Sequence, residues 1–282
     1  MLTNFNSMLK TAYAEHYAVG SFNVYNYETM RGVVDAALNL GCESVITAFG
    51  AKYLDNMSLE DAYALAKTLS ESRDMRVCLH LDHCSDMKIV YAAIRAGFGS
   101  VMYDGSALPF EQNAANTARI CDVAHACGVS VEAELGSLAA GLQSHEGDES
   151  DREVYTDPKA ALEFVKTTGT DALAVSVGTV HGMYKAEPNI RLDILSEIDS
   201  LCKIPLVLHG GSGVPENTIS ECIARGVAKI NVNTEISSYV VGHTVMDLAE
   251  KKLPHLSVLV KKQRGYVQEV AEKYIRFFEK RS

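Results

Sequence analysis

Three histidines stand at the ends of strand-like runs that lie far apart in the sequence. His83 follows the run VCLHLD, His181 ends the run AVSVGTVH, and His209 ends the run PLVLH. Three protein ligands with an open fourth position are a common arrangement for a catalytic zinc ion. One such histidine is more often structural, but three in equivalent positions predict a single catalytic metal site.

A carboxylate, Asp82, directly precedes the first of these histidines. Alternate side chains of a strand point to the same side, so Cys78, His80 and Asp82 share one face. We expect Asp82 to move a proton at a substrate hydroxyl. Cys84 follows His83 and is a weaker candidate ligand, because adjacent residues of a strand rarely point at the same ion.

Two segments rich in glycine and hydroxyl groups suggest a phosphate site. GGSG (210–213) and NVNT (231–234) follow or end the last two strand-like runs, and Lys185 adds a positive charge nearby. Glycines let backbone N–H groups converge on an anion, and hydroxyl groups add donors. A metal, a carboxylate and a phosphate cradle together suit cleavage of a carbon–carbon bond beside a ketone phosphate.

Eight strand-like runs, separated by helical patterns, would position these residues. The runs span residues 17–24, 44–50, 76–82, 100–104, 130–136, 172–178, 205–211 and 227–234. Asn26 is placed to cap one helix, and Asp157 before Pro158 marks the start of another. The length of 282 residues suits one barrel of eight βα units. We therefore predict an α/β fold: a single-domain (β/α)8 TIM barrel over residues 1–282.

Residues 235–282 follow the last expected strand and contain two helical stretches. We expect this C-terminal extension to cover the barrel and to contribute to a subunit contact. Within the strands, the alternation turns Glu132 and Glu134 to one face, and Lys229, Asn231 and Asn233 to another. Polar groups inside a barrel near the carboxyl ends of its strands are candidates for the active site.

The composition excludes several classes of partner. The net charge is −10 and there is no long basic run, so nucleic acid is not an expected partner. No segment approaches the roughly 20 apolar residues of a membrane span, so we expect no membrane partner. The seven cysteines are scattered, without a CxxC pair, and the first residues lack a signal-peptide core. These features predict a cytoplasmic protein.

Six ordered motifs resemble those of the class II, zinc-dependent ketose-bisphosphate aldolases, and they extend over nearly the whole chain. The segment SFNVYNYETM near the start is similar to the tagatose-bisphosphate branch of that family. The six motifs are HLDH (80–83), SVMYDGS (100–106), VEAELG (131–136), GTVHGMYK (178–185), LHGGSG (208–213) and KINVNTE (229–235).

The resemblance implies specific roles. His83, His181 and His209 would bind the catalytic Zn2+, and Asp82 would exchange a proton with the aldehyde oxygen. Asp104 and Glu134 match positions that bind a displaced or second metal. The residues expected to bind the phosphorylated sugar are Asn23, Gly182, Lys185, Gly210, Gly211, Ser212, Asn231, Asn233, Thr234 and, for the phosphate of the aldehyde half, Arg264. A monovalent cation, Na+ or K+, and a homodimer or homotetramer are also implied.

Two departures from the family pattern concern the identity of the sugar and the base that takes a proton from the ketone phosphate. The loop after ELG lacks the expected acid, because Gly141 and Leu142 stand in its place, and Glu146 is the nearest substitute. We expect loop 137–155 to be mobile, with Gly141 and Gly147 as hinges. Asn233 replaces an aspartate of the fructose-bisphosphate branch. Fructose or tagatose bisphosphate, another ketose 1-phosphate and a sugar-acid phosphate all remain open as substrates.

Three other functions are alternatives to a zinc-dependent aldolase. A Schiff-base aldolase would use Lys229, but the three histidines would then have no role. A zinc hydrolase on this fold usually has an HxH pair on its first strand, where this chain has SFNV. A metal-binding regulatory protein without activity is the non-enzyme alternative, and the missing loop acid slightly favours it.

Overall fold

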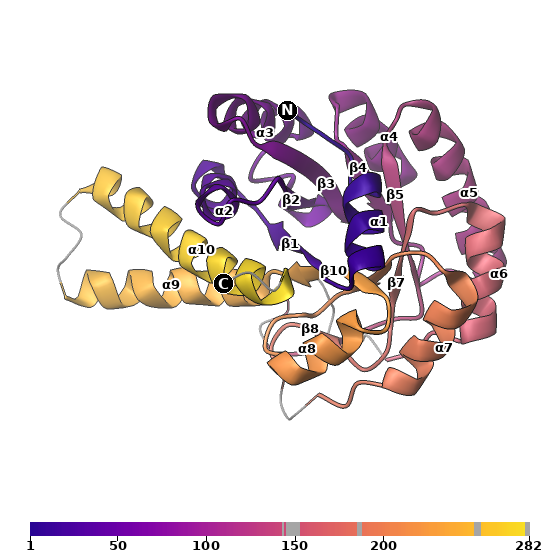
Figure 1. The fold of residues 1–282 in the computed structure, drawn as a ribbon. Helices are drawn as coiled ribbons and strands as arrows, with labels where there is room; N and C mark the ends of the chain where they lie inside the picture. Colours follow the sequence, from indigo (N-terminus) through magenta and orange to yellow (C-terminus); the bar gives the residue numbers. More distant parts are fainter. Residues whose placement is uncertain (143, 145–152, 185–187, 251–254, 280–282) are drawn as a thin grey trace.

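Eight parallel strands close into a barrel with helices around it, which confirms the predicted (β/α)8 architecture (Figure 1). The computed structural model describes residues 1–142, 144, 153–184, 188–250 and 255–279. In their order around the barrel the strands are β1 (Val19–Asn23), β2 (Ser44–Gly50), β3 (Arg76–Cys84), β4 (Ser100–Tyr103), β5 (Ser130–Leu135), β7 (Ala172–Val175), β9 (Leu206–Leu208) and β10 (Val227–Val232).

The surrounding helices begin at the capping residues that the sequence indicates. The side chain of Asn26 accepts a hydrogen bond from the Thr29 N–H, and Asp157 accepts one from the Ala160 N–H, as expected. The helices between strands are α2 (Tyr27–Asn39), α3 (Leu59–Arg73), α4 (Met87–Ala96), α5 (Phe110–Ala126), α6 (Pro158–Thr168), α7 (Leu192–Cys202) and α8 (Glu216–Ile223), with the short 3-10 helix η1 (Ala51–Tyr53) after β2.

Helix α1 (Asn6–Glu15), which the sequence analysis did not predict, closes one end of the barrel. Phe5 and Leu9 pack with Val19, Cys78 and Ala228 in an apolar cluster inside the barrel. Each of these strand residues lies near the amino end of its strand, so α1 covers the amino ends. The opposite end, where the strands finish, stays available for the polar residues.

Three strands end two or three residues earlier than predicted, and two new strands appear. The expected runs 172–178, 205–211 and 227–234 end as strands at Val175, Leu208 and Val232. Loops follow β7 and β9, whereas a helix begins at Thr234, just after β10. Two short strands, β6 (Ala139–Ala140) and β8 (Val180–His181), pair in parallel outside the barrel.

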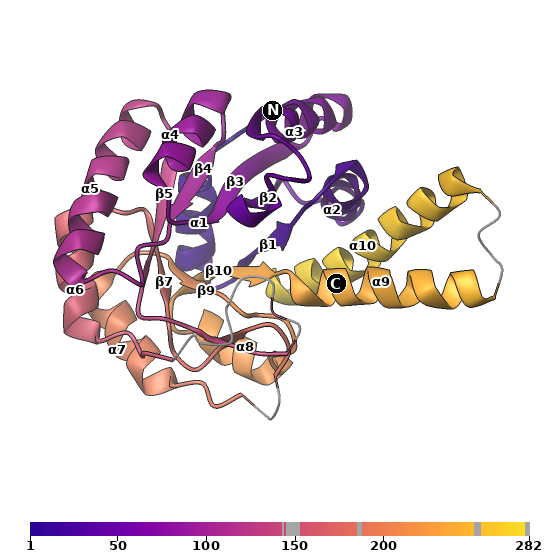
Figure 2. The ribbon, with the colours of Figure 1, turned by 180° about the vertical axis from the view of Figure 1, so that it is seen from behind.

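The C-terminal helices form an arm. Helices α9 (Thr234–Ala249) and α10 (Leu256–Phe278) lie antiparallel and project from the barrel (Figures 1 and 2). The expectation that both helices cover the barrel holds for one end of each. The start of α9 packs on the barrel through Ile236, and the C-terminal half of α10 packs on it beside α2. Its buried residues there are Val267, Val270, Ala271, Tyr274, Ile275 and Phe278.

Candidate active site

Asp82 and His83 both face the mouth of the barrel although they are adjacent in β3. The backbone of His83 has a φ of 42°, in the left-handed region, and the register between β3 and β4 shifts between Leu81 and Cys84. This irregularity breaks the alternation of side chains, so that consecutive residues turn to one site. A left-handed non-glycine residue of this kind is often found at functional sites.

The three histidines meet at this mouth. One ring nitrogen from each of His83, His181 and His209 lies within 4.8 Å of the others. Nδ1 of His209 lies 2.8 Å from Nε2 of His83. The opposite nitrogens of these two rings face carboxylates: His83 Nδ1 is 3.1 Å from Asp104, and His209 Nε2 is 2.8 Å from Glu132.

These contacts fit a metal ion. A carboxylate only accepts hydrogen bonds, so the nitrogens that face Asp104 and Glu132 carry the hydrogens. The lone pairs of His83 Nε2 and His209 Nδ1 then point at one another, an arrangement that a cation between them stabilises. Nε2 of His181 is buried and has no hydrogen-bond partner among the described residues. The donor set of three imidazole nitrogens is one that zinc prefers.

His181 is not at the end of a barrel strand, which corrects the sequence prediction. It belongs to β8, six residues after β7 ends, and β8 is held by the loop that follows β5. Gly141 N–H donates to the His181 carbonyl at 2.6 Å, and Leu142 and Met183 exchange two backbone hydrogen bonds. Burial, with His83 and His209 nearby, keeps the pKa of His181 well below its ordinary value, so the ring stays neutral, as a ligand must.

This pairing also changes the interpretation of Gly141. A Cβ atom at this position would lie 2.6 Å from the Met183 carbonyl oxygen. Gly141 is therefore a point of close backbone approach rather than the hinge that we expected. The base of loop 137–155 is fixed by β6, whereas Gly147 and Glu146 lie outside the described residues.

A second group of ligands shares His83. Atoms of His83, Asp104 and Glu134 also lie within 4.8 Å of one another. Burial and the neighbouring Asp104 carboxylate hold the pKa of Glu134 well above its ordinary value. Glu134 Oε2 is buried without a hydrogen-bond partner among the described residues. The structure thus brings Asp104 and Glu134 together as the resemblance implies for a second or displaced metal.

Asp82 is held as an ionised carboxylate. Asn23 donates to its Oδ2 at 2.9 Å and Asn231 donates to its Oδ1 at 3.1 Å. Burial alone would raise the pKa of Asp82, but His83 and Lys229 nearby outweigh burial and lower the pKa below its ordinary value. A buried, oriented carboxylate beside the histidines can act as a base towards a substrate hydroxyl.

The expected phosphate residues form one small pocket. It is lined by Gly182, Gly210, Ser212, Asn231, Asn233 and Thr234. Thr234 begins α9, so the pocket lies at a helix N-terminus, where backbone N–H groups and the helix dipole favour an anion. Gly182 and Gly210 have φ angles of 107° and 69°, which other residues rarely adopt.

Gly211 has a different role from the one expected. Its N–H already donates to the Asn231 carbonyl at 3.2 Å. A Cβ atom there would lie 2.5 Å from Ile230 Cγ2. Gly211 therefore supports the pocket by letting the loop pack closely on β10.

Two tyrosines that the sequence analysis missed hold Asn233. The Tyr25 hydroxyl donates to Asn233 Oδ1, and Asn233 Nδ2 donates to the Tyr53 hydroxyl at 3.1 Å. Tyr53 also lines a small pocket with Lys52, Asp82 and His83. Tyr25 lies in the segment SFNVYNYETM, but that segment gave no sign of this contact. No motif marks Lys52 or Tyr53, because their position depends on how η1 folds over the barrel mouth.

Glu132 and Lys229 are further residues whose contacts were not anticipated. Lys229 Nζ lies 2.9 Å from Glu132 Oε2 inside the barrel, and both side chains are fully buried. This ion pair disfavours the Schiff-base alternative, because a lysine nucleophile must be neutral. The alternation within strands had turned both residues inward, and both lie in motifs that carry the family resemblance. Neither signal predicted that the two side chains pair.

Two other candidates, Arg264 and Cys84, are not brought into this cluster, and two more lie outside the described residues. Arg264 lies on α10, where its carbonyl faces Gly32 of α2 on the outside of the barrel. Cys84 is buried, and its thiol donates to the Asp86 carbonyl. Burial raises its pKa to about 11, so it is not a ready ligand. Lys185, like Glu146, lies outside the described residues.

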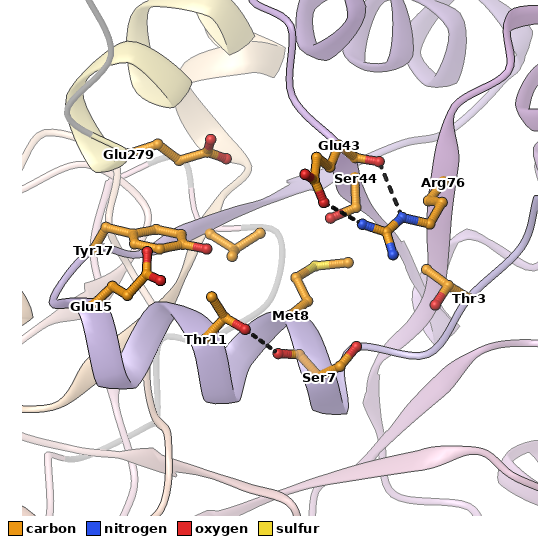
Figure 3. Close-up of a pocket in the computed structure, with 11 residues that line it drawn as sticks. Thr3, Ser7, Met8, Thr11, Glu15, Tyr17, Glu43, Ser44, Arg76 and Glu279 are labelled. Atoms are coloured by element: carbon orange, nitrogen blue, oxygen red, sulfur yellow. Dashed lines mark hydrogen bonds and ion pairs between the residues drawn. The ribbon is translucent and has the colours of Figure 1, made fainter.

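A larger cavity of about 610 Å³ lies at the other end of the barrel, beside α1 (Figure 3). Arg76 pairs there with Glu43 at 2.6 Å, and both side chains are exposed. Glu15 and Glu279 also line it. It contains none of the metal-ligand groups found among the described residues, and barrel enzymes carry their chemistry at the opposite end.

Among the described residues, no helix combines the length and the apolar character that crossing a membrane requires.

Comparison with known proteins agrees with this site. The sequence model of the family "Fructose-bisphosphate aldolase class-II" matches residues 3–282. The sulfofructosephosphate aldolase of Alkalicoccus urumqiensis is 40% identical over 230 residues, which are 82% of this chain and 79% of that protein. A probable fructose-bisphosphate aldolase of Bacillus subtilis strain 168 is 41% identical over 242 residues, or 83% and 82% of the two chains.

Two solved structures share the architecture. The YdjI aldolase of Escherichia coli K12 superposes with a TM-score of 0.86 and 34% identity, covering 99% of this chain and 97% of that one. A putative fructose-1,6-bisphosphate aldolase of Coccidioides immitis gives a TM-score of 0.87 at 26% identity, covering 98% and 96%. The chain therefore belongs to the class II fructose-bisphosphate aldolase family and is an aldolase, a lyase that breaks a carbon–carbon bond.

Proposed function

We propose that the protein is a zinc-dependent aldolase that reversibly cleaves a ketose phosphate into dihydroxyacetone phosphate and an aldehyde. The observation that carries this proposal is the convergence of His83, His181 and His209 beside the buried carboxylate of Asp82. A zinc ion held by these histidines supplies Lewis acidity, which polarises a carbonyl and stabilises the negative charge that develops on its oxygen.

Asp82 acts on the hydroxyl of the carbon that becomes the aldehyde. In cleavage its carboxylate takes the hydroxyl proton, the carbon–carbon bond breaks, and the electron pair stays with the dihydroxyacetone phosphate half. In condensation Asp82 returns the proton to the aldehyde oxygen. Asn23 and Asn231 hold the two carboxylate oxygens and so fix the direction of the transfer.

The pocket at the start of α9 binds the phosphate of the ketone half. Gly182, Gly210 and Ser212 supply backbone and hydroxyl donors, and Thr234 lies at the helix N-terminus. Asn231 and Asn233 also line this pocket. The family resemblance implies that Lys185 adds a positive charge. We expect Na+ or K+ beside this phosphate on the basis of the family resemblance, and the rate in K+, Na+ or choline buffers tests it.

The sugar is a ketose 1-phosphate whose far end carries an anion. Fructose or tagatose 1,6-bisphosphate is the first choice, and a sulfonated ketose phosphate or a sugar-acid phosphate is the alternative. The relatives include both a sulfofructosephosphate aldolase and a probable fructose-bisphosphate aldolase. Lys52, beside Asp82 and His83 in the second small pocket, supports an anionic aldehyde half.

A substrate screen tests the function directly. Ketose 1-phosphates are incubated with the zinc-loaded protein, and released dihydroxyacetone phosphate is reduced by a coupled dehydrogenase. We expect turnover with one of the anionic sugars, loss of turnover on chelation, and recovery with zinc. Turnover that survives complete zinc removal would contradict the proposal, and so would the absence of turnover with every sugar.

Glu146 is our candidate for the base that takes the α-proton of dihydroxyacetone phosphate during condensation. The test is exchange of that proton with solvent in the absence of an aldehyde. Glu146→Gln should exchange far more slowly than the parent, whereas Asp82→Asn should still exchange. If Glu146→Gln exchanges at the parental rate, another residue is the base.

We further propose that the protein is a cytoplasmic homodimer or homotetramer. Its seven cysteines are free thiols, which suits a reducing compartment. The arm of α9 and α10 exposes Val241, Val245 and Met246, and a second copy would cover them. On the basis of the family resemblance, we also propose that Arg264 binds the phosphate of the aldehyde half. Light scattering of the parent and of Val245→Asp tests the assembly, and a monomeric parent would exclude it.

A further inference from the structure

Lys229 on β10 is a buried amine that the proposed reaction does not use. Its Nζ lies 2.9 Å from Glu132 Oε2 and donates to Asn231 Oδ1 at 2.6 Å. The side chains of Lys229 and Glu132 are both 0% exposed. Removing one partner from a buried ion pair leaves an uncompensated charge, so these two residues function as a unit.

Glu132 connects this unit to a metal ligand. Its other oxygen, Oε1, lies 2.8 Å from Nε2 of His209. Since the carboxylate only accepts, it places the ring hydrogen on Nε2 and leaves the lone pair on Nδ1. Nδ1 is the atom that faces His83 in the histidine cluster. Glu132 therefore selects the tautomer and the ring orientation with which His209 can bind a metal.

Asn231 connects the same unit to Asp82. An ammonium group has no acceptor, so the Lys229 contact identifies the amide atom that faces it as the oxygen. The Asn231 amide nitrogen is thereby turned towards Asp82 Oδ1, at 3.1 Å. The buried ammonium group of Lys229 thus orients both Glu132 and Asn231. Glu132 in turn holds His209, and Asn231 holds Asp82.

We propose that Lys229 and Glu132 are positioning residues, a buried ion pair that orients His209 for metal binding and, through Asn231, orients Asp82. This inference rests on the proposed function, because it requires a metal at the histidine cluster. Metal affinity then depends on Glu132 accepting a hydrogen bond from His209. Lys229 keeps the Glu132 carboxylate charged and in place.

Two double variants separate the effect of the hydrogen-bond acceptor at position 132 from the effect of the ion pair with Lys229. Glu132→Met/Lys229→Met removes both charges at similar volume, a replacement that buried pairs usually tolerate. It leaves His209 Nε2 without its acceptor. Glu132→Gln/Lys229→Met also removes both charges, but its amide oxygen can still accept from His209. Zinc affinity is measured by competition with a chelator, and the visible spectrum of the cobalt-substituted protein reports the ligand geometry.

We expect the Met/Met variant to bind zinc about 10–100-fold more weakly than the parent and to show an altered cobalt spectrum. The Gln/Met variant should recover most of the affinity. Ser100→Ala is the matched control: it removes a buried hydrogen bond to His80 at 2.8 Å inside the same barrel and should bind zinc like the parent. Equal zinc affinities for the parent and the Met/Met variant, or for the two double variants, would overturn the inference.

The test also separates this inference from the proposed function. If the parent itself binds no zinc, the proposed function fails and the inference fails with it. If the parent binds zinc and the Met/Met variant binds equally well, the inference alone fails. Should the Met/Met variant not fold, Glu132→Asp replaces it, because the shorter side chain keeps the charge near Lys229 but withdraws from His209. Unchanged zinc affinity in Glu132→Asp would then overturn the inference.

Discussion

Nε2 of His83 and Nδ1 of His209 lie 2.8 Å apart, although 126 residues separate them in the sequence. Each ring is held from behind by a carboxylate, Asp104 for His83 and Glu132 for His209. The two rings therefore meet with their lone pairs directed to the same point. This relationship makes the histidine cluster a prepared metal site and leads to the first prediction.

We expect alanine at His83, His181 or His209 to reduce bound zinc sharply, because each change removes one of three nitrogen ligands. Metal content after dialysis against a weak chelator measures the effect. His125→Ala is the control, since His125 lies on α5 and bonds Asp171 outside the cluster. A variant that retains full zinc occupancy would remove that histidine from the ligand set.

Asp82→Asn should retain zinc and lose about 10²–10⁴-fold in turnover, the usual contribution of a general acid–base group. The amide has nearly the same size but cannot take a proton from the substrate hydroxyl. Steady-state cleavage and metal analysis on the same preparation provide both measurements. A loss of only a few-fold would mean that Asp82 does not transfer the proton.

Gly210→Ala should weaken binding of the phosphorylated substrate and raise KM. Gly210 has a φ of 69°, and a Cβ atom would lie 2.2 Å from the Val180 carbonyl oxygen, so the loop must move. Gly128→Ala is the control, because Gly128 has a similar φ of 73° but no atom within 4 Å of its Cβ position. Equal KM values for the two variants would show that the geometry of this loop is not needed for binding.

Lys52→Met should raise KM for a ketose 1-phosphate with an anionic far end and leave KM for a neutral analogue unchanged. Lys52 lines a small pocket with Asp82, which acts on the hydroxyl of the aldehyde half in the proposed reaction. Lys67→Met on α3 is the charge-matched control. The same change in KM for both substrates would exclude a role for Lys52 in recognising the anion.

Acid should destabilise the parent more steeply than the Glu132→Met/Lys229→Met variant. Burial alone would raise the pKa of Glu132, but Lys229 and His209 lower it from 4.5 to about 2. A carboxyl whose pKa is lower in the folded state contributes stability above its unfolded pKa. That contribution, at most about 3 kcal/mol, is lost as the pH falls from about 4.5 to about 2.

Urea unfolding of both proteins in chelator measures this difference, because metal release then affects neither protein. Acidic groups away from this pair titrate alike in the two proteins and cancel in the comparison. Asp82, whose pKa Lys229 also lowers, adds to the difference in the same direction. Identical slopes of unfolding free energy against pH would show that the Glu132 charge does not contribute to stability in this window.

The sequence by itself determined the class of fold and the chemistry of the site. Eight apolar runs with capped helices between them specify a barrel, because strand alternation and helix caps are local properties, as Asn26 and Asp157 illustrate. The histidines, Asp82 and the glycine-rich segments marked the mouth of that barrel, because parallel strands of a barrel end on the same side.

Tertiary structure decided how these residues meet. The left-handed backbone of His83, the pairing of β8 with β6 that places His181, and the ion pair of Glu132 with Lys229 all depend on contacts between distant segments. Local patterns contain no information about such contacts. For the same reason, three further features were found only in the folded chain. They are the position of α1, the hydrogen bonds of Tyr25 and Tyr53 with Asn233, and the projecting arm of α9 and α10.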